Sequence, residues 1–155
     1  MTRKFPGRLA RLIPVVALAL TCASGAVLAQ GNAATPSGLW KTIDDDTKQA
    51  KALIRVTERD GQFSGRIEKI LTDKADAKCE LCTDERKDKP VQGMTIVTGM
   101  KRDGEHWSGG HILDPNNGKV YRSQMKLIDG GKRMEVRGYI GTPLLGRTQT
   151  WHREE

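Results

Sequence analysis

Aromatic side chains are scarce in this 155-residue chain, at 5% of all residues. Proteins that bind single-stranded nucleic acid stack bases on such side chains, and few platforms of this kind are present. The formal charge of +7 and the isoelectric point near 9.5 would by themselves suggest a nucleic-acid partner. However, basic and acidic residues alternate, as in residues 69–74 and 84–88, and basic arms are missing from the rest of the chain. The charge pattern therefore argues against a nucleic-acid partner.

Acidic residues are also missing from the start of the chain, where the first is Asp44. The N-terminal region instead carries four basic residues, Arg3, Lys4, Arg8 and Arg11. An apolar run over residues 12–20 comes next, and small residues follow it up to Ala29. This order predicts a secretory signal peptide over residues 1–29, cleaved after Ala29. The alternative is an uncleaved anchor, although the run is shorter than the roughly 20 residues that a spanning helix needs.

Cleavage at this site would change both the location and the charge of the protein. We expect a periplasmic or secreted protein without a stable membrane anchor, and Cys22 is removed with the signal because the residues before it fit a lipid-attachment site poorly. Removal of the four basic residues lowers the net charge from +7 to +3. Residues 30–37 are small and polar, which indicates a flexible lead into a domain over residues 38–155.

The remaining chain is divided by turn signals such as Asp60-Gly61 and Asp103-Gly104 into short runs rich in strand-forming residues. These runs cover residues 38–43, 52–58, 62–71, 93–101, 105–113, 119–128, 132–140 and 145–153. Apolar residues at helical spacing are not sustained, so at most a short helix is expected, near residues 72–77. Close strand spacing is typical of all-β folds. It predicts an eight-stranded antiparallel up-and-down β-barrel, with a two-sheet sandwich as the alternative.

Three stretches carry a resemblance to a known family: GLWKTIDD at 38–45, GGHILDP at 109–115, and VRGYIG followed by LGRTQTW at 136–141 and 145–151. Together they resemble DUF2147, a family of exported bacterial proteins without an assigned function. The resemblance implies a lipocalin-like β-barrel. It also implies that Trp40 plugs one barrel end under an arginine, and Arg147 and Arg153 are the candidates for that arginine. Trp151 is expected at the same structural end. The family supplies no catalytic residues.

The pair Cys79 and Cys82 is the sharpest chemical feature of the predicted domain. In an oxidising compartment two nearby thiols tend to form a disulfide, which would pin the long loop between the third and fourth strands. A redox-active pair is one alternative, although such pairs normally open a helix in a βαβ unit. A zinc site is another alternative, and it would need further ligands among His106, His111 and His152. These histidines do not have the sequence spacing of a zinc-ligand pair.

Four methionines fall on apolar strand faces, where flexible side chains can adapt to irregular contents. We therefore predict a barrel lining made of Met94, Ile96, Met100, Tyr121, Met125 and Met134. No nucleophile elbow and no phosphate-binding loop is present, so no catalytic residue, cofactor or metal is predicted. The favoured hypothesis is a protein that binds a small, partly apolar ligand. The alternatives are a structural or interaction module of the cell envelope with a filled core, and a redox or metal protein centred on Cys79 and Cys82.

Overall fold

The fold is described by a computed structural model, which covers residues 1–2 and 34–155. The predicted signal peptide, its cleavage site after Ala29 and residues 30–33 of the lead lie outside the described residues. No helix in the part that the structure describes is long and apolar enough to cross a membrane.

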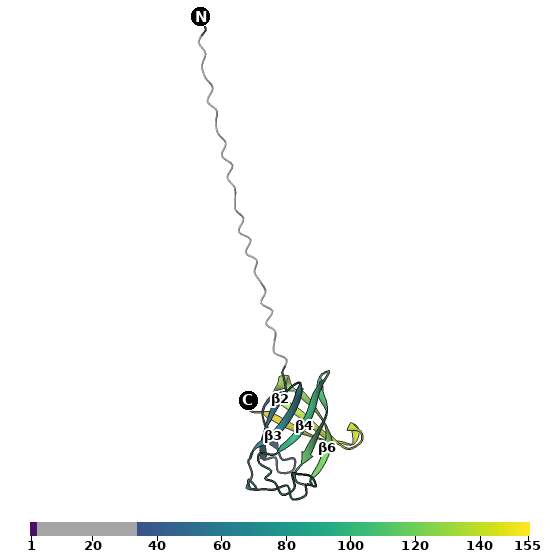
Figure 1. Cartoon of the computed structure of the whole chain (residues 1–155). Helices are drawn as coiled ribbons and strands as arrows, with labels where there is room; N and C mark the ends of the chain where they lie inside the picture. Colours follow the sequence, from purple (N-terminus) through teal and green to yellow (C-terminus); the bar gives the residue numbers. More distant parts are fainter. Residues whose placement is uncertain (3–33) are drawn as a thin grey trace. The chain divides into compact units, whose positions relative to one another are not determined.

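Eight antiparallel strands follow one another around a closed barrel (Figure 1). The first and last strands pair with each other through Trp40 and Arg153, so the sheet has no free edge and the sandwich alternative is wrong. The strands are β1 (Gly38–Ile43), β2 (Ala50–Arg59), β3 (Gln62–Ile70), β4 (Thr95–Asp103), β5 (His106–Asp114), β6 (Lys119–Ile128), β7 (Arg133–Tyr139) and β8 (Arg147–Arg153).

The up-and-down order gives the barrel two different ends. Three tight hairpins, β2–β3, β4–β5 and β6–β7, turn at one end, which also holds the start of β1 and the end of β8. We call this the closed end. The other four connections lie at the opposite end, which we call the open end, and one of them is the long loop 71–94 (Figure 1).

Two glycines make β5 irregular. The pairing of β5 with β6 shifts between Trp107 and Gly110, and Gly109 has a φ of +77°. A Cβ at Gly110 would lie 2.3 Å from the Thr98 carbonyl oxygen and 2.6 Å from the Met100 sulfur. The strand therefore bulges here, and its backbone approaches β4 too closely for any larger residue.

Buried and exposed side chains do not alternate regularly in β4, because Ile96 and Val97 are both buried and Thr98 is exposed. The reason is that the pairing of β3 with β4 shifts twice, and Gly99 takes a left-handed φ of +68°. Residues 72–77 form bends and turns rather than the expected helix. Short 3-10 turns occur instead at Asp129–Gly131 and Pro143–Leu145.

Candidate functional site

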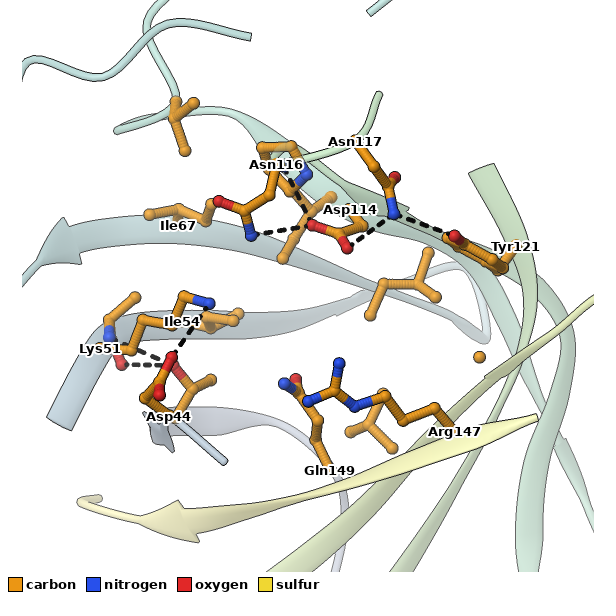
Figure 2. A pocket seen from close by; sticks show the side chains of 18 of the residues that line it. Asp44, Lys51, Ile54, Ile67, Asp114, Asn116, Asn117, Tyr121, Arg147 and Gln149 are labelled. Atoms are coloured by element: carbon orange, nitrogen blue, oxygen red, sulfur yellow. Dashed lines mark hydrogen bonds and ion pairs between the residues drawn. The ribbon is translucent and has the colours of Figure 1, made fainter. Parts of the chain in front are cut away.

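The open half of the barrel is hollow and holds a cavity of about 880 Å³. Its walls are mainly aliphatic, and Figure 2 shows Ile54 and Ile67 among the lining side chains. Inward-facing positions on seven strands supply the apolar wall and floor: Ala52, Ile54, Ile67, Ile96, Ile112, Val136, Gly138 and Trp151, with Tyr121. A volume of this size is within the range of sites that enclose small organic molecules.

The methionines that were expected to line this space do not line it. Ile96 and Tyr121 border the cavity as predicted, whereas none of the four methionines does. Met100, Met125 and Met134 lie toward the closed ends of their strands and are fully buried there. They fill the closed half together with Trp40, Val56, Phe63 and Trp107. Met94 precedes β4 and is buried without reaching the cavity.

The closed end is sealed by Arg153 stacked over Trp40. The guanidinium carbon lies 4.2 Å from the ring centroid, which is a favourable cation–π geometry. The same guanidinium donates to the carbonyl oxygens of Thr35, Ser37 and Gly131 at 2.6–2.8 Å. The Trp40 indole nitrogen donates to the carbonyl of Pro36 at 2.7 Å. Residues 35–37 are therefore part of the seal, although they were expected in a flexible lead.

Arg147, the other candidate for this seal, lies at the opposite end of the barrel. Its side chain is 71% exposed at the mouth of the cavity, and its guanidinium donates to the Asp45 carboxylate at 2.5 Å. Trp151 lies between the two arginines in β8 and forms part of the cavity floor. The expectation that Arg147 and Trp151 belong to the closed end is therefore wrong.

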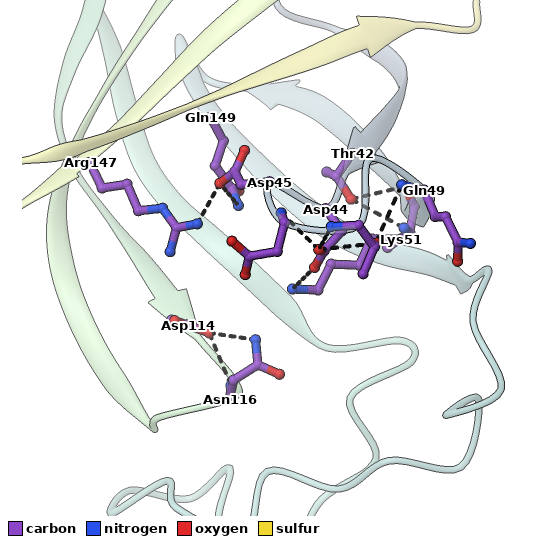
Figure 3. Close-up of polar contacts among 12 residues, drawn as sticks. Thr42, Asp44, Asp45, Gln49, Lys51, Asp114, Asn116, Arg147 and Gln149 are labelled. Atoms are coloured by element: carbon purple, nitrogen blue, oxygen red, sulfur yellow. Dashed lines mark hydrogen bonds and ion pairs between the residues drawn. The ribbon is translucent and has the colours of Figure 1, made fainter.

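Polar groups surround the mouth (Figure 3). Asp45 also accepts a hydrogen bond from the Gln149 amide at 3.5 Å, so it ties the β1–β2 loop to the inward face of β8. The neighbouring Asp44 accepts hydrogen bonds from the backbone of Asp46 and Thr47 at 3.1 and 2.9 Å. These bonds, above all that from Thr47, lower the pKa of Asp44 to about 2. The turn at residues 44–46 is thus held by hydrogen bonds from its own backbone to the Asp44 carboxylate.

The β5–β6 turn brings a second polar group to the mouth, opposite Arg147 and Gln149 in Figure 2. Asp114 accepts hydrogen bonds from the side-chain amides of Asn116 and Asn117, both at 3.0 Å. Asn117 also donates to the Tyr121 phenol oxygen at 3.0 Å. The Tyr121 phenol thus joins the polar group of this turn to the cavity wall.

Loop 71–94 contributes one side of the mouth, and Thr72, Lys74, Ala77 and Leu81 border the cavity. The loop is held by the predicted disulfide between Cys79 and Cys82. It also contacts the β5–β6 turn, where a Cβ at Gly118 would lie 1.9 Å from the Leu81 carbonyl oxygen. The loop is therefore a fixed wall of the entrance, seated on a glycine because no larger residue would fit.

The alternative chemistry at the cysteines finds little support in this geometry. Cys79 and Cys82 are 0% and 2% exposed, so an attacking thiolate would have to open the loop first. Within residues 34–155, no group of three His, Cys, Asp or Glu side chains is placed to hold a metal ion. His106 and His111 lie at positions 1 and 6 of β5, and His152 lies near the end of β8.

Comparisons with known proteins agree with this architecture. A solved structure from the human pathogen Helicobacter pylori, described as a member of the lipocalin family, matches with a TM-score of 0.67. The match covers 77% of this chain and 82% of the other at 17% identity, so it shows the shared fold alone. A search of curated proteins finds no match. The sequence profile of DUF2147, described as an uncharacterized protein conserved in bacteria, matches residues 38–153. The chain therefore belongs to the DUF2147 family.

Proposed function

We propose that this protein is an exported carrier or receptor that binds a small, partly apolar molecule in the open half of its barrel. The observation that carries the proposal is the cavity of about 880 Å³ with an aliphatic wall and a polar mouth. Apolar walls supply affinity through removal of ligand surface from water, and the few polar groups fix orientation. The lipocalin-like fold supports the same function, and the signal-like N-terminal sequence supports the exported location.

Division of the barrel into two halves explains how such a site remains stable while hollow. The closed half carries the large side chains, including two of the three tryptophans and three methionines. The open half can then be left empty because the sheet is already closed and anchored by the Arg153–Trp40 seal. A structural module of the cell envelope is expected to have a core that is filled throughout. In this barrel only the closed half is filled, so the ligand-binding function is favoured.

A fluorescence titration with N-phenyl-1-naphthylamine tests the proposal. This apolar dye brightens when it leaves water, and we expect saturable binding to the wild-type protein. Ile54→Trp places a large ring in the cavity and should weaken binding at least tenfold. Val120→Trp is the matched control, because Val120 is 46% exposed on the same barrel wall as Tyr121 but does not line the cavity.

The two variants separate a ligand site from a surface effect. The proposal predicts wild-type affinity for Val120→Trp and lost affinity for Ile54→Trp, with both proteins folded by circular dichroism. Absence of saturable binding by the wild type, or equal binding by the two variants, would contradict it.

A further inference from the structure

Exposed apolar side chains gather at one end of the barrel. Within residues 34–155, the large apolar side chains that remain exposed are Leu71, Leu81, Val120, Ile140, Leu144 and Leu145. Two of them belong to loop 71–94, one is the second residue of β6, and three lie in the connection between β7 and β8. All six therefore lie at the open end. Single exposed apolar residues are common on soluble proteins, but a gathering at one end marks a contact surface.

The connection between β7 and β8 is the most apolar part of this end. Leu144 and Leu145 are 89% and 82% exposed, and Ile140 is 64% exposed. The nine residues 138–146 (GYIGTPLLG) contain no charged side chain. In Figure 1 this connection, drawn in yellow-green, projects from the barrel. We call the side chains of Ile140, Leu144 and Leu145 the apolar tip.

Arg137 fixes the projecting loop to the barrel. Its guanidinium donates to the carbonyl oxygens of Pro143 at 2.6 Å and Leu144 at 3.3 Å, and to the Thr148 hydroxyl at 2.6 Å. Amides within the loop donate to the carbonyls of Thr142 and Pro143 at 3.2 and 3.1 Å. Three successive carbonyls thus have donors inside the protein. A loop satisfied in this way can leave water at a lower cost than one whose carbonyls depend on water.

The charges beside the tip are nearly balanced. The acidic side chains that border the cavity are Asp44, Asp45, Asp46, Glu80 and Asp114, and the basic ones are Lys51, Lys74, Lys78 and Arg147. Two ion pairs already join them, Asp45 with Arg147 and Asp44 with Lys51. This rim has no large excess of either sign with which to attract a strongly charged partner. A layer of zwitterionic lipid headgroups above hydrocarbon presents the complementary arrangement, with both charges outside and an apolar phase beneath.

We propose that the open end docks on a lipid bilayer with zwitterionic headgroups, with the apolar tip inserted toward the acyl chains and the charged rim among the headgroups. Ile140 and Leu145 also border the cavity, so docking turns the cavity entrance toward the membrane. An apolar molecule dissolved in the bilayer can then reach the aliphatic wall without crossing water. Docking goes beyond ligand binding, and each can be measured without the other.

Vesicle flotation tests the docking. The protein is recovered after export, so that its signal-like N-terminal run does not itself bind lipid, and is mixed with phosphatidylcholine vesicles. We expect the wild type to float with them, and Leu144→Ser to lower the partition coefficient at least fivefold because an exposed apolar side chain is lost. Leu144→Met keeps an apolar side chain and should bind as the wild type does.

Two controls separate docking from damage to the barrel. Leu71→Ser makes the same change after β3, four strands away from β7 around the barrel, and should retain vesicle binding. Leu144 does not border the cavity, so Leu144→Ser should bind N-phenyl-1-naphthylamine with wild-type affinity when vesicles are left out. Phosphatidylglycerol added to the vesicles should change the partition coefficient by less than about threefold, because the rim charges nearly balance.

A paramagnetic lipid locates the contact in the wild-type protein. In bicelles that carry a doxyl-labelled phosphatidylcholine, the amide signals of Leu144 and Leu145 should broaden, and those of Gly61 and Gly104 at the closed end should not. Uniform broadening, equal flotation of Leu144→Ser and the wild type, or binding that requires phosphatidylglycerol would overturn the proposal. Self-association through the tip without vesicle binding would overturn it in favour of a second copy of the chain. Dye binding that persists in each of these cases leaves the ligand-binding function standing.

Discussion

Met134 on β7 and Trp151 on β8 are register partners, and the boundary between the filled and the hollow half of the barrel passes between them. Met134 is fully buried and belongs to the packed half, whereas Trp151 borders the cavity. One pair thus shows how a single barrel can contain both a packed core and an open cavity.

The closed-end seal should contribute strongly to stability. Arg153→Met keeps the unbranched aliphatic stem but removes the guanidinium. The carbonyls of Thr35, Ser37 and Gly131 then lose their donor. Loss of these charge-assisted bonds and of the stacking on Trp40 should lower the free energy of unfolding by roughly 3 kcal/mol. Urea denaturation measures the change.

Arg133→Met is the matched control for that experiment. Arg133 pairs with Asp129 at the same end, but both side chains are about half exposed. An exposed ion pair contributes only about 0–1 kcal/mol. Equal losses for Arg133→Met and Arg153→Met would contradict the role of Arg153 as the seal.

The order of the strands predicts which of the two arginines, Arg153 or Arg147, lies over Trp40. In an up-and-down barrel the first strand begins at the end where the eighth strand finishes, so Trp40 near the start of β1 must lie beside the end of β8. The same reasoning places Met125 and Met134 near the closed end, because the β6–β7 hairpin turns there. Strand periodicity alone says which side chains point inward but not how far along the barrel axis they lie.

Other features of the fold could be predicted from the sequence. The limits of β1 and β6 follow from their turn residues and agree with the structure at both ends. The bulge at Gly109 and Gly110 follows from two adjacent glycines in a strand pattern. The cavity itself could not be predicted, because the sequence does not say which half of the barrel the large side chains fill.

The disulfide should stabilise the entrance rather than the barrel. Replacing both Cys79 and Cys82 with serine removes a link that closes a very short loop, so the change acts mainly on that loop. We expect faster amide hydrogen exchange in residues 77–91, where Val91 donates to the Ala77 carbonyl and Cys79 to the Lys89 carbonyl. The amides of β6 and β7 should exchange as in the wild type, and a uniform loss of protection would contradict this division.

Asp44 should make the fold sensitive to acid. Its pKa in the folded protein is about 2, below the ordinary value of 3.8, so the ionised form is favoured by folding. The stabilisation is present above pH 3.8 and is lost as the pH falls toward 2. NMR titration of the Asp44 carboxyl carbon should give a midpoint near pH 2, and Thr47→Ala should raise it because the hydroxyl bond is lost. An unshifted midpoint in the wild type would contradict the turn geometry.

The Asp45–Arg147 pair should govern charge selectivity at the mouth. Asp45→Asn removes the carboxylate with which the Arg147 guanidinium forms its ion pair. Binding of the anionic dye 8-anilinonaphthalene-1-sulfonate should strengthen several-fold, and neutral N-phenyl-1-naphthylamine should bind as before. Because Arg147 is largely exposed, stability should change by less than about 1 kcal/mol. Equal effects on both dyes would indicate that the pair shapes the entrance rather than its charge.

A methyl NMR titration tests the two-compartment barrel most directly. The protein is labelled at the isoleucine δ1 and methionine ε methyl groups and titrated with N-phenyl-1-naphthylamine. We predict that the signals of Ile54, Ile67, Ile96 and Ile112 shift with a common dissociation constant, while those of Met100, Met125 and Met134 remain in place. Methionine shifts as large as the isoleucine shifts, or dye binding that leaves the isoleucine signals unmoved, would contradict a hollow open half above a filled closed half.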